Sequence, residues 1–115
     1  MSESAADFNR RREEGNARIL EDAPLSIKRF FALDEDVYAP GSLTKRTKEL
    51  LGLVASTVLR CNDCIAYHIE QATKAGATRA ELIEALGVAL VVGGSVTIPH
   101  LRFATEFLEK QQPAD

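Results

Sequence analysis

The sequence of 115 residues has no tryptophan, one methionine, two cysteines, four prolines and seven glycines. Two cysteines are too few to staple a small secreted domain with disulfides. The low glycine and proline content excludes collagen-like and low-complexity chains. Apolar residues make up 45% of the chain and charged residues 27%, a balance that excludes a wholly disordered chain. A chain of this length is expected to fold as one domain, residues 1–115, around a single core.

The sequence also lacks an excess of positive charge and a long apolar run. Its formal net charge is −3, so we expect no nucleic-acid partner. The longest apolar stretch, 82–92, is too short for a bilayer span of about 20 residues. Residues 1–22 are polar and have no apolar signal-peptide region. We therefore expect a cytoplasmic protein without a membrane partner. In the reducing cytoplasm, a single pair of cysteines indicates a catalytic, redox-sensing or metal-binding role rather than a structural disulfide.

The chain is predicted to be all-α, with about five to six helices and no strand. No proline lies between positions 41 and 98, and alanine and leucine, which favour helix, are abundant. The expected helices cover about 4–22 (a polar N-terminal helix or arm), 25–33, 42–60, 64–74, 78–92 and 97–111. Asp34 to Gly41 is predicted to be a loop that ends in a Pro-Gly turn.

Several helix ends carry capping signals. Ser42 is a plausible N-cap for the third helix. Gly76 fits a C-terminal cap because glycine tolerates a left-handed backbone. Thr78 is followed three residues later by Glu81, which is the pattern of a capping box.

The stretch 82–92, LIEALGVALVV, contains only one charged residue, Glu84. A helix that is apolar all round is normally buried, and so small a domain rarely encloses one completely. The pattern predicts a homo-oligomer in which a partner subunit covers this helix. The alternative is an unusually central helix in a monomer.

The chemistry-bearing motif is Cys61-x-x-Cys64-x-x-x-His68 at a predicted helix start. Spacings of three, four and seven residues put the three side chains on one helix face. The unpaired N–H groups at a helix N-terminus stabilise a thiolate. A histidine near its ordinary pKa of about 6.5 can accept the thiol proton. The two sulfurs are close enough in sequence to form a disulfide across one turn.

Glu49 is a candidate to orient this histidine. It lies twelve residues before Cys61, on the preceding predicted helix. If the two helices pack antiparallel, its carboxylate holds one nitrogen of His68, directly or through a water. The alternative is an ordinary helix-surface charge beside Lys45 and Lys48.

Other interpretations of these residues stay open. The cysteines alone fit two buried core residues, or half of a zinc site completed by His68 and a carboxylate. We expect no metal, because one short helix face suits a disulfide better than a tetrahedral site. The charged run Arg10 to Glu14 is predicted to be a solvated face, and His100 a surface or interface residue without a role. Four phenylalanines are assigned to core or interface packing: Phe30, Phe31, Phe103 and Phe107.

Residues 43–94 closely resemble the alkylhydroperoxidase D-like (AhpD-like) branch of the carboxymuconolactone decarboxylase family. The likeness covers about half the chain and rests on E-x11-C-x-x-C-x-x-x-H and on A-G-A-T-x-x-E-x-x-E-A from Ala75 to Ala85. It implies an all-α fold, a homo-oligomer (hexamer or trimer) and thiol-dependent reduction of a hydroperoxide substrate. By this likeness Glu49 and His68 form a proton relay to the redox pair, Cys61 and Cys64. A thiol or dihydrolipoyl-type protein serves as reductant, and no cofactor is implied.

The chain departs from the family pattern inside the motif. The best-known members carry a second histidine between the two cysteines, where this sequence has Asn62 and Asp63. An acidic Asp63 disfavours a neighbouring thiolate. Two alternative functions follow, a protein disulfide oxidoreductase and a redox-sensing or structural oligomer without peroxide turnover. Lactone decarboxylation is less expected, because the decarboxylase that names the family does not rely on a cysteine pair.

Overall fold

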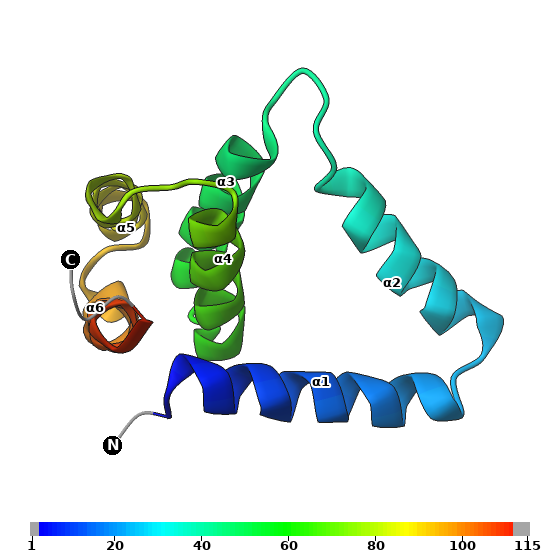
Figure 1. The fold of residues 1–115 in the computed structure, drawn as a ribbon. Helices are drawn as coiled ribbons and strands as arrows, with labels where there is room; N and C mark the ends of the chain where they lie inside the picture. Colours follow the sequence, from blue (N-terminus) through cyan, green and yellow to red (C-terminus); the bar gives the residue numbers. More distant parts are fainter. Residues whose placement is uncertain (1–2, 112–115) are drawn as a thin grey trace.

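The computed structural model describes residues 3–111, which are helical almost throughout (Figure 1). The elements are α1 (Ala5–Glu21), α2 (Leu25–Val37), α3 (Lys45–Val58), α4 (Asn62–Lys74), α5 (Arg79–Gly93), the 3-10 turn η1 (Ser95–Thr97) and α6 (Ile98–Gln111). The predicted all-α class, with five to six helices, is confirmed. None of the helices within residues 3–111 combines the length and apolar character needed to cross a membrane.

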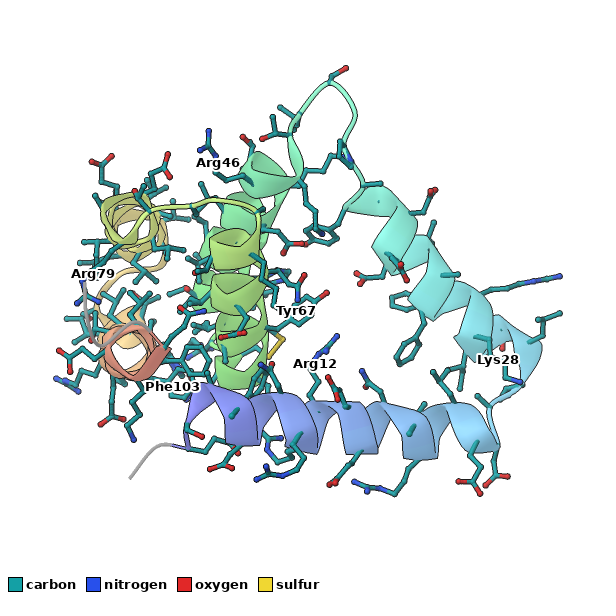
Figure 2. The ribbon with its side chains drawn as sticks, viewed as in Figure 1. Arg12, Lys28, Arg46, Tyr67, Arg79 and Phe103 are labelled. Atoms are coloured by element: carbon teal, nitrogen blue, oxygen red, sulfur yellow. A yellow bond between two sulfur atoms is a disulfide. The ribbon has the colours of Figure 1, made fainter. Side chains whose placement is uncertain are left out.

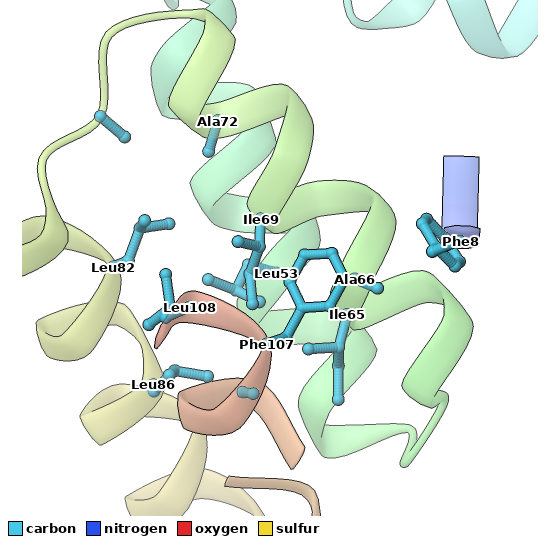
Figure 3. Close-up of a cluster of buried hydrophobic side chains, with 12 residues drawn as sticks. Phe8, Leu53, Ile65, Ala66, Ile69, Ala72, Leu82, Leu86, Phe107 and Leu108 are labelled. Atoms are coloured by element: carbon cyan, nitrogen blue, oxygen red, sulfur yellow. The ribbon is translucent and has the colours of Figure 1, made fainter. Parts of the chain in front are cut away.

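Helices α3 to α6 form the body of the molecule. A three-residue link joins α3 to α4, and the two helices pack side by side in opposite directions (Figure 1). Helix α5 packs against α3, and α6 closes the core against α4 and α5. The core side chains come from all four helices and from α1: Leu53, Ile65, Ile69, Leu82, Leu86, Phe107, Leu108 and Phe8 (Figure 3).

The caps account for where the helices begin and end. The predicted box at Thr78 and Glu81 is confirmed, with both reciprocal hydrogen bonds formed. Gly76 has φ +100°, as expected for a residue that ends a helix. The predicted N-cap Ser42 is wrong. Thr44 caps α3 instead, because the Gly41 N–H bonds the Leu43 carbonyl and holds the preceding residues in a turn.

Two predicted boundaries shift, by four residues at the end of α2 and by two at the start of α4. Helix α2 continues to Val37 rather than ending at Leu33, so the first half of the predicted 34–41 loop is helical. The Tyr38 N–H still bonds the carbonyl of Asp34, which extends the last turn. Before α4, the chain breaks at Arg60, which has φ +60°. Cys61 is therefore the N-cap, and α4 begins at Asn62, two residues earlier than the start predicted near Cys64.

Helices α1 and α2 form an arm beside the body: α1 crosses the end of the body where α4 begins, and the loop after α2 returns to the start of α3 at the opposite end (Figure 1). Phe8 is the buried residue of α1 and meets the Phe107 ring edge-on, with centroids 5.9 Å apart. Asn9 adds a hydrogen bond of 3.2 Å to the buried Glu70 carboxylate. Helix α2 has no buried residue, and its apolar side chains, including Phe30 at 67% exposure, face away from any core.

Helix α5 is apolar on both its inner and outer faces. Leu82, Leu86 and Ala89 are buried in the body. On the outer face Val91 is 84% exposed and Val92 is 68% exposed. The body therefore covers the inner face of the 82–92 stretch and leaves the apolar side chains of its outer face exposed.

The single aromatic anchor of α1 leads to a prediction about local stability. Removing a packed phenylalanine ring costs about 3–5 kcal/mol. We expect Phe8→Ala to release α1 from the body, so that trypsin cuts rapidly at Arg10, Arg11 or Arg12 while α3 to α6 stay helical by circular dichroism. Ile19→Ala on the same helix removes a side chain that is 49% exposed and should leave the cleavage rate unchanged. Equal cleavage of the two variants would contradict this anchoring role.

Candidate active site

The two cysteines lie at the N-terminus of α4 and are joined as a disulfide. Cys61 is the N-cap residue, and its sulfur accepts a hydrogen bond of 3.2 Å from the Cys64 backbone N–H. Their Cα atoms are 5.2 Å apart. The predicted pairing within one turn is thus confirmed, and the structure represents the oxidised form of the motif.

Glu49 and His68 meet across the α3–α4 hairpin, as the spacing predicts. The Glu49 Oε1 atom lies 2.8 Å from His68 Nδ1, so the contact is direct. Glu49 is completely buried, and Lys45 Nζ donates to its other oxygen at 3.0 Å. Burial raises the pKa of the Glu49 carboxyl, but the hydrogen bonds and charges of His68 and Lys45 outweigh it and hold the pKa below its usual value. The interpretation as an ordinary surface charge is wrong.

His68 is held between two tyrosine rings above a glycine. The centroids of Tyr38 and Tyr67 lie 5.4 and 5.1 Å from that of the imidazole. A Cβ atom added to Gly52 would stand 2.6 Å from His68 Cε1 and 2.8 Å from the Tyr38 hydroxyl. Glycine at this position of α3 is therefore what lets the imidazole lie against the helix backbone. Burial, followed by the Glu49 charge, raises the pKa of both tyrosines, so they stay neutral beside the histidine.

A cavity of about 400 Å³ opens between the arm and α4. Cys64, Tyr67 and His68 line it from α4, whereas Cys61 does not. An adjoining hollow of about 290 Å³ is lined by Phe30 and Phe31 of α2. Figure 2 shows Arg12 rising from α1 into this space and Tyr67 reaching toward it from α4. The reactive turn thus faces a chamber large enough for a small organic molecule.

The arm contributes charged residues that the sequence did not indicate. Arg11 donates to both carboxylate oxygens of Asp63, at 2.9 and 3.1 Å. The guanidinium of Arg12 lies 4.2 Å from the centroid of the Tyr67 ring. The prediction of a solvated face is wrong for Arg12, which is half-buried and lines the cavity. No signal in the run 10–14 separates Arg12 from its neighbours, because its contact depends on where α1 crosses α4.

The remaining candidates fall outside the cavity or beside it. His100 Nδ1 lies 2.7 Å from Asn62 Oδ1 at the exposed rim of the motif. Phe107 is buried in the core and Phe103 packs against it, as predicted. Phe30 is exposed and Phe31 is partly buried at the second hollow. Within residues 3–111, no three histidine, cysteine or acidic side chains are clustered as they would be around a metal ion.

The close approach at Gly52 makes a testable stability prediction. Forcing a methyl group into a packed site costs about 1–3 kcal/mol. Gly52→Ala should lower the urea midpoint and displace His68 from Glu49, seen as a shift of the imidazole NMR signals. In Gly15→Ala the nearest atom is the flexible Arg18 guanidinium at 3.8 Å, so this helical control should keep or slightly raise stability. If both variants unfold at the same midpoint, Gly52 is not a packing requirement.

The sequence is similar to a known protein family and to individual proteins. A model of the carboxymuconolactone decarboxylase family matches residues 24–107. The chain is 35% identical over 81 residues to the uncharacterized protein 4 in the cox locus of Paracoccus denitrificans, a match that covers 70% of this chain and 73% of that protein. It is 31% identical over 85 residues to the uncharacterized protein H16_B0147 of Cupriavidus necator, covering 74% and 73% of the two chains.

Solved structures share the arrangement of the helices. The crystal structure of TM1620 from Thermotoga maritima has 56% identity and a TM-score of 0.88, with 90% of this chain and 91% of that chain covered. Apo-lpg0406 of Legionella pneumophila has 28% identity and a TM-score of 0.83, with 92% and 95% covered. The family match spans most of the chain and contains all four residues of the motif. The chain therefore belongs to the carboxymuconolactone decarboxylase family, within the AhpD-like superfamily.

Proposed function

We propose that this protein is a thiol-dependent hydroperoxide reductase in which Cys61 and Cys64 supply the two electrons. One observation carries the proposal: Cys64 shares a cavity wall with a histidine that a buried carboxylate holds in place. A merely structural disulfide has no need of this proton-handling pair. A second crystal structure of TM1620 describes that protein as a candidate participant in the antioxidative response, which is consistent with the same chemistry.

The relay begins in the reduced protein. Glu49 occupies Nδ1 of His68, which leaves Nε2 as the nitrogen able to accept the Cys64 proton. The thiolate attacks the terminal oxygen of the hydroperoxide and breaks the O–O bond. His68 returns its proton to the departing alkoxide, giving an alcohol and a sulfenic acid on Cys64. The Cys61 thiol then forms the S–S bond and releases water. The sum is ROOH plus two thiols giving ROH, water and one disulfide.

Cys64 is the sulfur proposed to attack. It lies one helical turn before His68 and lines the cavity, whereas Cys61 is placed to resolve the intermediate from the N-cap position. A small thiol or a dihydrolipoyl-type protein then reduces the disulfide by exchange. Neither a metal nor an organic cofactor takes part in this scheme.

The negative charge of Asp63 is compensated by an ion pair. Its carboxylate is bound by Arg11, so the negative charge beside Cys64 is paired with a positive one. The Arg11 side chain is 50% exposed and the Asp63 side chain 65%, and ion pairs at such a surface contribute about 0–1 kcal/mol to stability. Asp63 thus weakens a neighbouring thiolate less than an unpaired carboxylate would.

The assignment of attacking and resolving sulfurs can be tested directly. With one equivalent of cumene hydroperoxide, the reduced protein should lose two protons by mass spectrometry without forming a covalent dimer. Cys61→Ser should accumulate a sulfenic acid on Cys64 that dimedone traps, and Cys64→Ser should react at the rate of a free thiol. A fast Cys64→Ser variant would reverse the roles. Oxidation by protein disulfides alone, or a size change without turnover, would instead indicate an oxidoreductase or a redox-sensing oligomer.

The Glu49–His68 relay makes a second prediction. Glu49→Gln keeps the size of the side chain but removes the charge that stabilises the imidazolium, and assistance of this kind contributes about 10²–10⁴-fold. Stopped-flow measurement of Cys64 oxidation at neutral pH should show such a loss for Glu49→Gln and an equal or larger loss for His68→Ala. The double variant should lose little more than His68→Ala, because members of one relay are not additive. Glu109→Gln removes an exposed carboxylate of α6, away from the site and from α5, and is the matched control.

We also propose that the protein is a homo-oligomer, a hexamer or trimer, that covers the outer face of α5. Between α3 and α5 runs an apolar groove of about 670 Å³, bordered by Leu51, Leu59, Val88 and Val92. A large contiguous apolar surface of this kind is uncommon on a soluble monomer. In a contact across a two-fold axis, as in a hexamer of D3 symmetry, a second copy of the chain offers the same apolar surface in return.

Val91→Glu tests the assembly without disturbing the fold. Val91 is 84% exposed in the single chain, so a charge there is solvated in a monomer but buried in an oligomer. Light scattering should show the wild type as an oligomer and Val91→Glu as a folded chain near 12.6 kDa. Leu86 is unsuitable for this test because it is 2% exposed and belongs to the core. A wild-type protein that is monomeric at micromolar concentration would refute the assembly.

A further inference from the structure

The cavity beside Cys64 contains a cation that the relay does not use. Arg12 is half-buried in its wall, whereas the neighbouring Arg10 and Arg11 are exposed. Arg10 is ion-paired with Asp7, and Arg11 is ion-paired with Asp63 and Glu3. Among the residues that the structure describes, no carboxylate forms an ion pair with Arg12, whose contact is the face of Tyr67 at 4.2 Å.

Stacking on a ring leaves an arginine able to bind a further group. The guanidinium carbon of Arg12 lies over the Tyr67 ring, and the N–H donors of a guanidinium project from the edge of its plane. Those donors match the two oxygens of a carboxylate, which they bind as a pair of parallel hydrogen bonds. The Tyr67 ring also limits the directions in which the side chain can move. Arg12 is thus a pre-oriented cation, and no side chain or backbone group within residues 3–111 accepts a hydrogen bond from its donors.

The rest of the chamber is largely apolar. Phe8 and Ile19 line the first cavity, and Phe30 and Phe31 line the adjoining hollow, which shares Arg12 and Tyr67 with it. A ligand that fits both regions places an apolar body against the phenylalanines and a charged group at Arg12. Hydrogen peroxide offers neither.

We propose that Arg12 binds a carboxylate on the substrate, so that the preferred oxidant is an organic hydroperoxide with an acidic group on an apolar chain. This inference rests on the proposed function. The ionic contact at Arg12 holds the molecule while its O–O bond reacts at Cys64. The electron and atom balance of the reaction is unchanged, because the carboxylate only binds.

One charge in the cavity opposes this binding. Asp34 lines both hollows from α2, and its carboxylate repels an anion there. The other charged groups around the cavity are the paired Arg11 and Asp63. Arg12 and Asp34 are therefore expected to have opposite effects on the binding of an anion. Removing Arg12 weakens anion binding, and removing Asp34 strengthens it.

The first test needs no peroxidase activity. Reduced Cys61→Ser protein, which keeps only Cys64, is alkylated at one pH with iodoacetate and with iodoacetamide. The two reagents differ by one carboxylate, and the ratio of their rates cancels any change in the thiolate fraction. We expect Arg12→Gln to lower the iodoacetate-to-iodoacetamide ratio about three- to tenfold. Asp34→Asn should raise it, and Arg12→Lys should fall between the wild type and Arg12→Gln.

The matched control is Arg10→Gln, which removes an equal charge from the same helix outside the cavity. It should leave the ratio within twofold of the wild type at physiological salt. An unchanged ratio in Arg12→Gln would overturn the proposal. An equal fall in Arg10→Gln would also overturn it, because the effect would then come from the general field of α1.

The second test decides whether the carboxylate belongs to the oxidant. Linoleic acid hydroperoxide and its methyl ester are compared as oxidants of the reduced wild type, and dihydrolipoate and dihydrolipoamide as reductants of the disulfide. The proposal requires a preference for the acid hydroperoxide over its methyl ester that Arg12→Gln removes. A preference confined to dihydrolipoate would refute the assignment to the oxidant. If neither hydroperoxide reacts, the proposed function fails, whereas the ratio of the alkylation rates still tests whether Arg12 binds a carboxylate.

Discussion

The buried contact between Glu49 and His68 is the constraint around which the site is organised. A carboxylate with no exposed surface is expensive to bury unless its charge and lone pairs are satisfied. Here Lys45 and His68 occupy one oxygen each. Breaking such a buried pair by removing one partner costs about 3–5 kcal/mol. The fold and the proposed chemistry thus depend on the same two bonds, and the bond to His68 ties the register of α3 to that of α4.

The α3–α4 hairpin provides that register by local means. Thr44 starts α3, and a left-handed residue at Arg60 reverses the chain so that Cys61 begins α4 at once. A longer link would let α4 slide relative to α3 and would separate the two members of the relay. Gly52 then removes the one side chain that would keep the imidazole away from α3. The spacing of the motif follows from this geometry, because the eleven residues between Glu49 and Cys61 form the rest of α3 and the turn.

This explains which parts of the site were predictable. Glu49, Cys61, Cys64 and His68 lie within twenty residues on two consecutive helices, so periodicity and one short turn suffice to bring them together. Arg11 and Arg12 are fifty residues away from their partners on α4. Their contacts depend on the crossing of α1, which one buried phenylalanine fixes and no local pattern encodes. The predicted end of α2 is wrong for a different reason, because the Pro-Gly turn at 40–41 marks where the loop ends and not where the helix before it ends.

The arm therefore contributes much more to the cavity than to the core. It adds little to the core, since only Phe8 is buried in α1 and no residue is buried in α2. Yet it forms most of the cavity wall that faces Cys64. A segment held by few contacts opens at a lower free-energy cost than the body does. An apolar body of substrate can thus enter between α1 and α4 without disturbing Glu49 or His68. The proposed relay needs a rigid frame and lies in the hairpin, whereas the proposed recognition of substrate tolerates movement and lies in the arm.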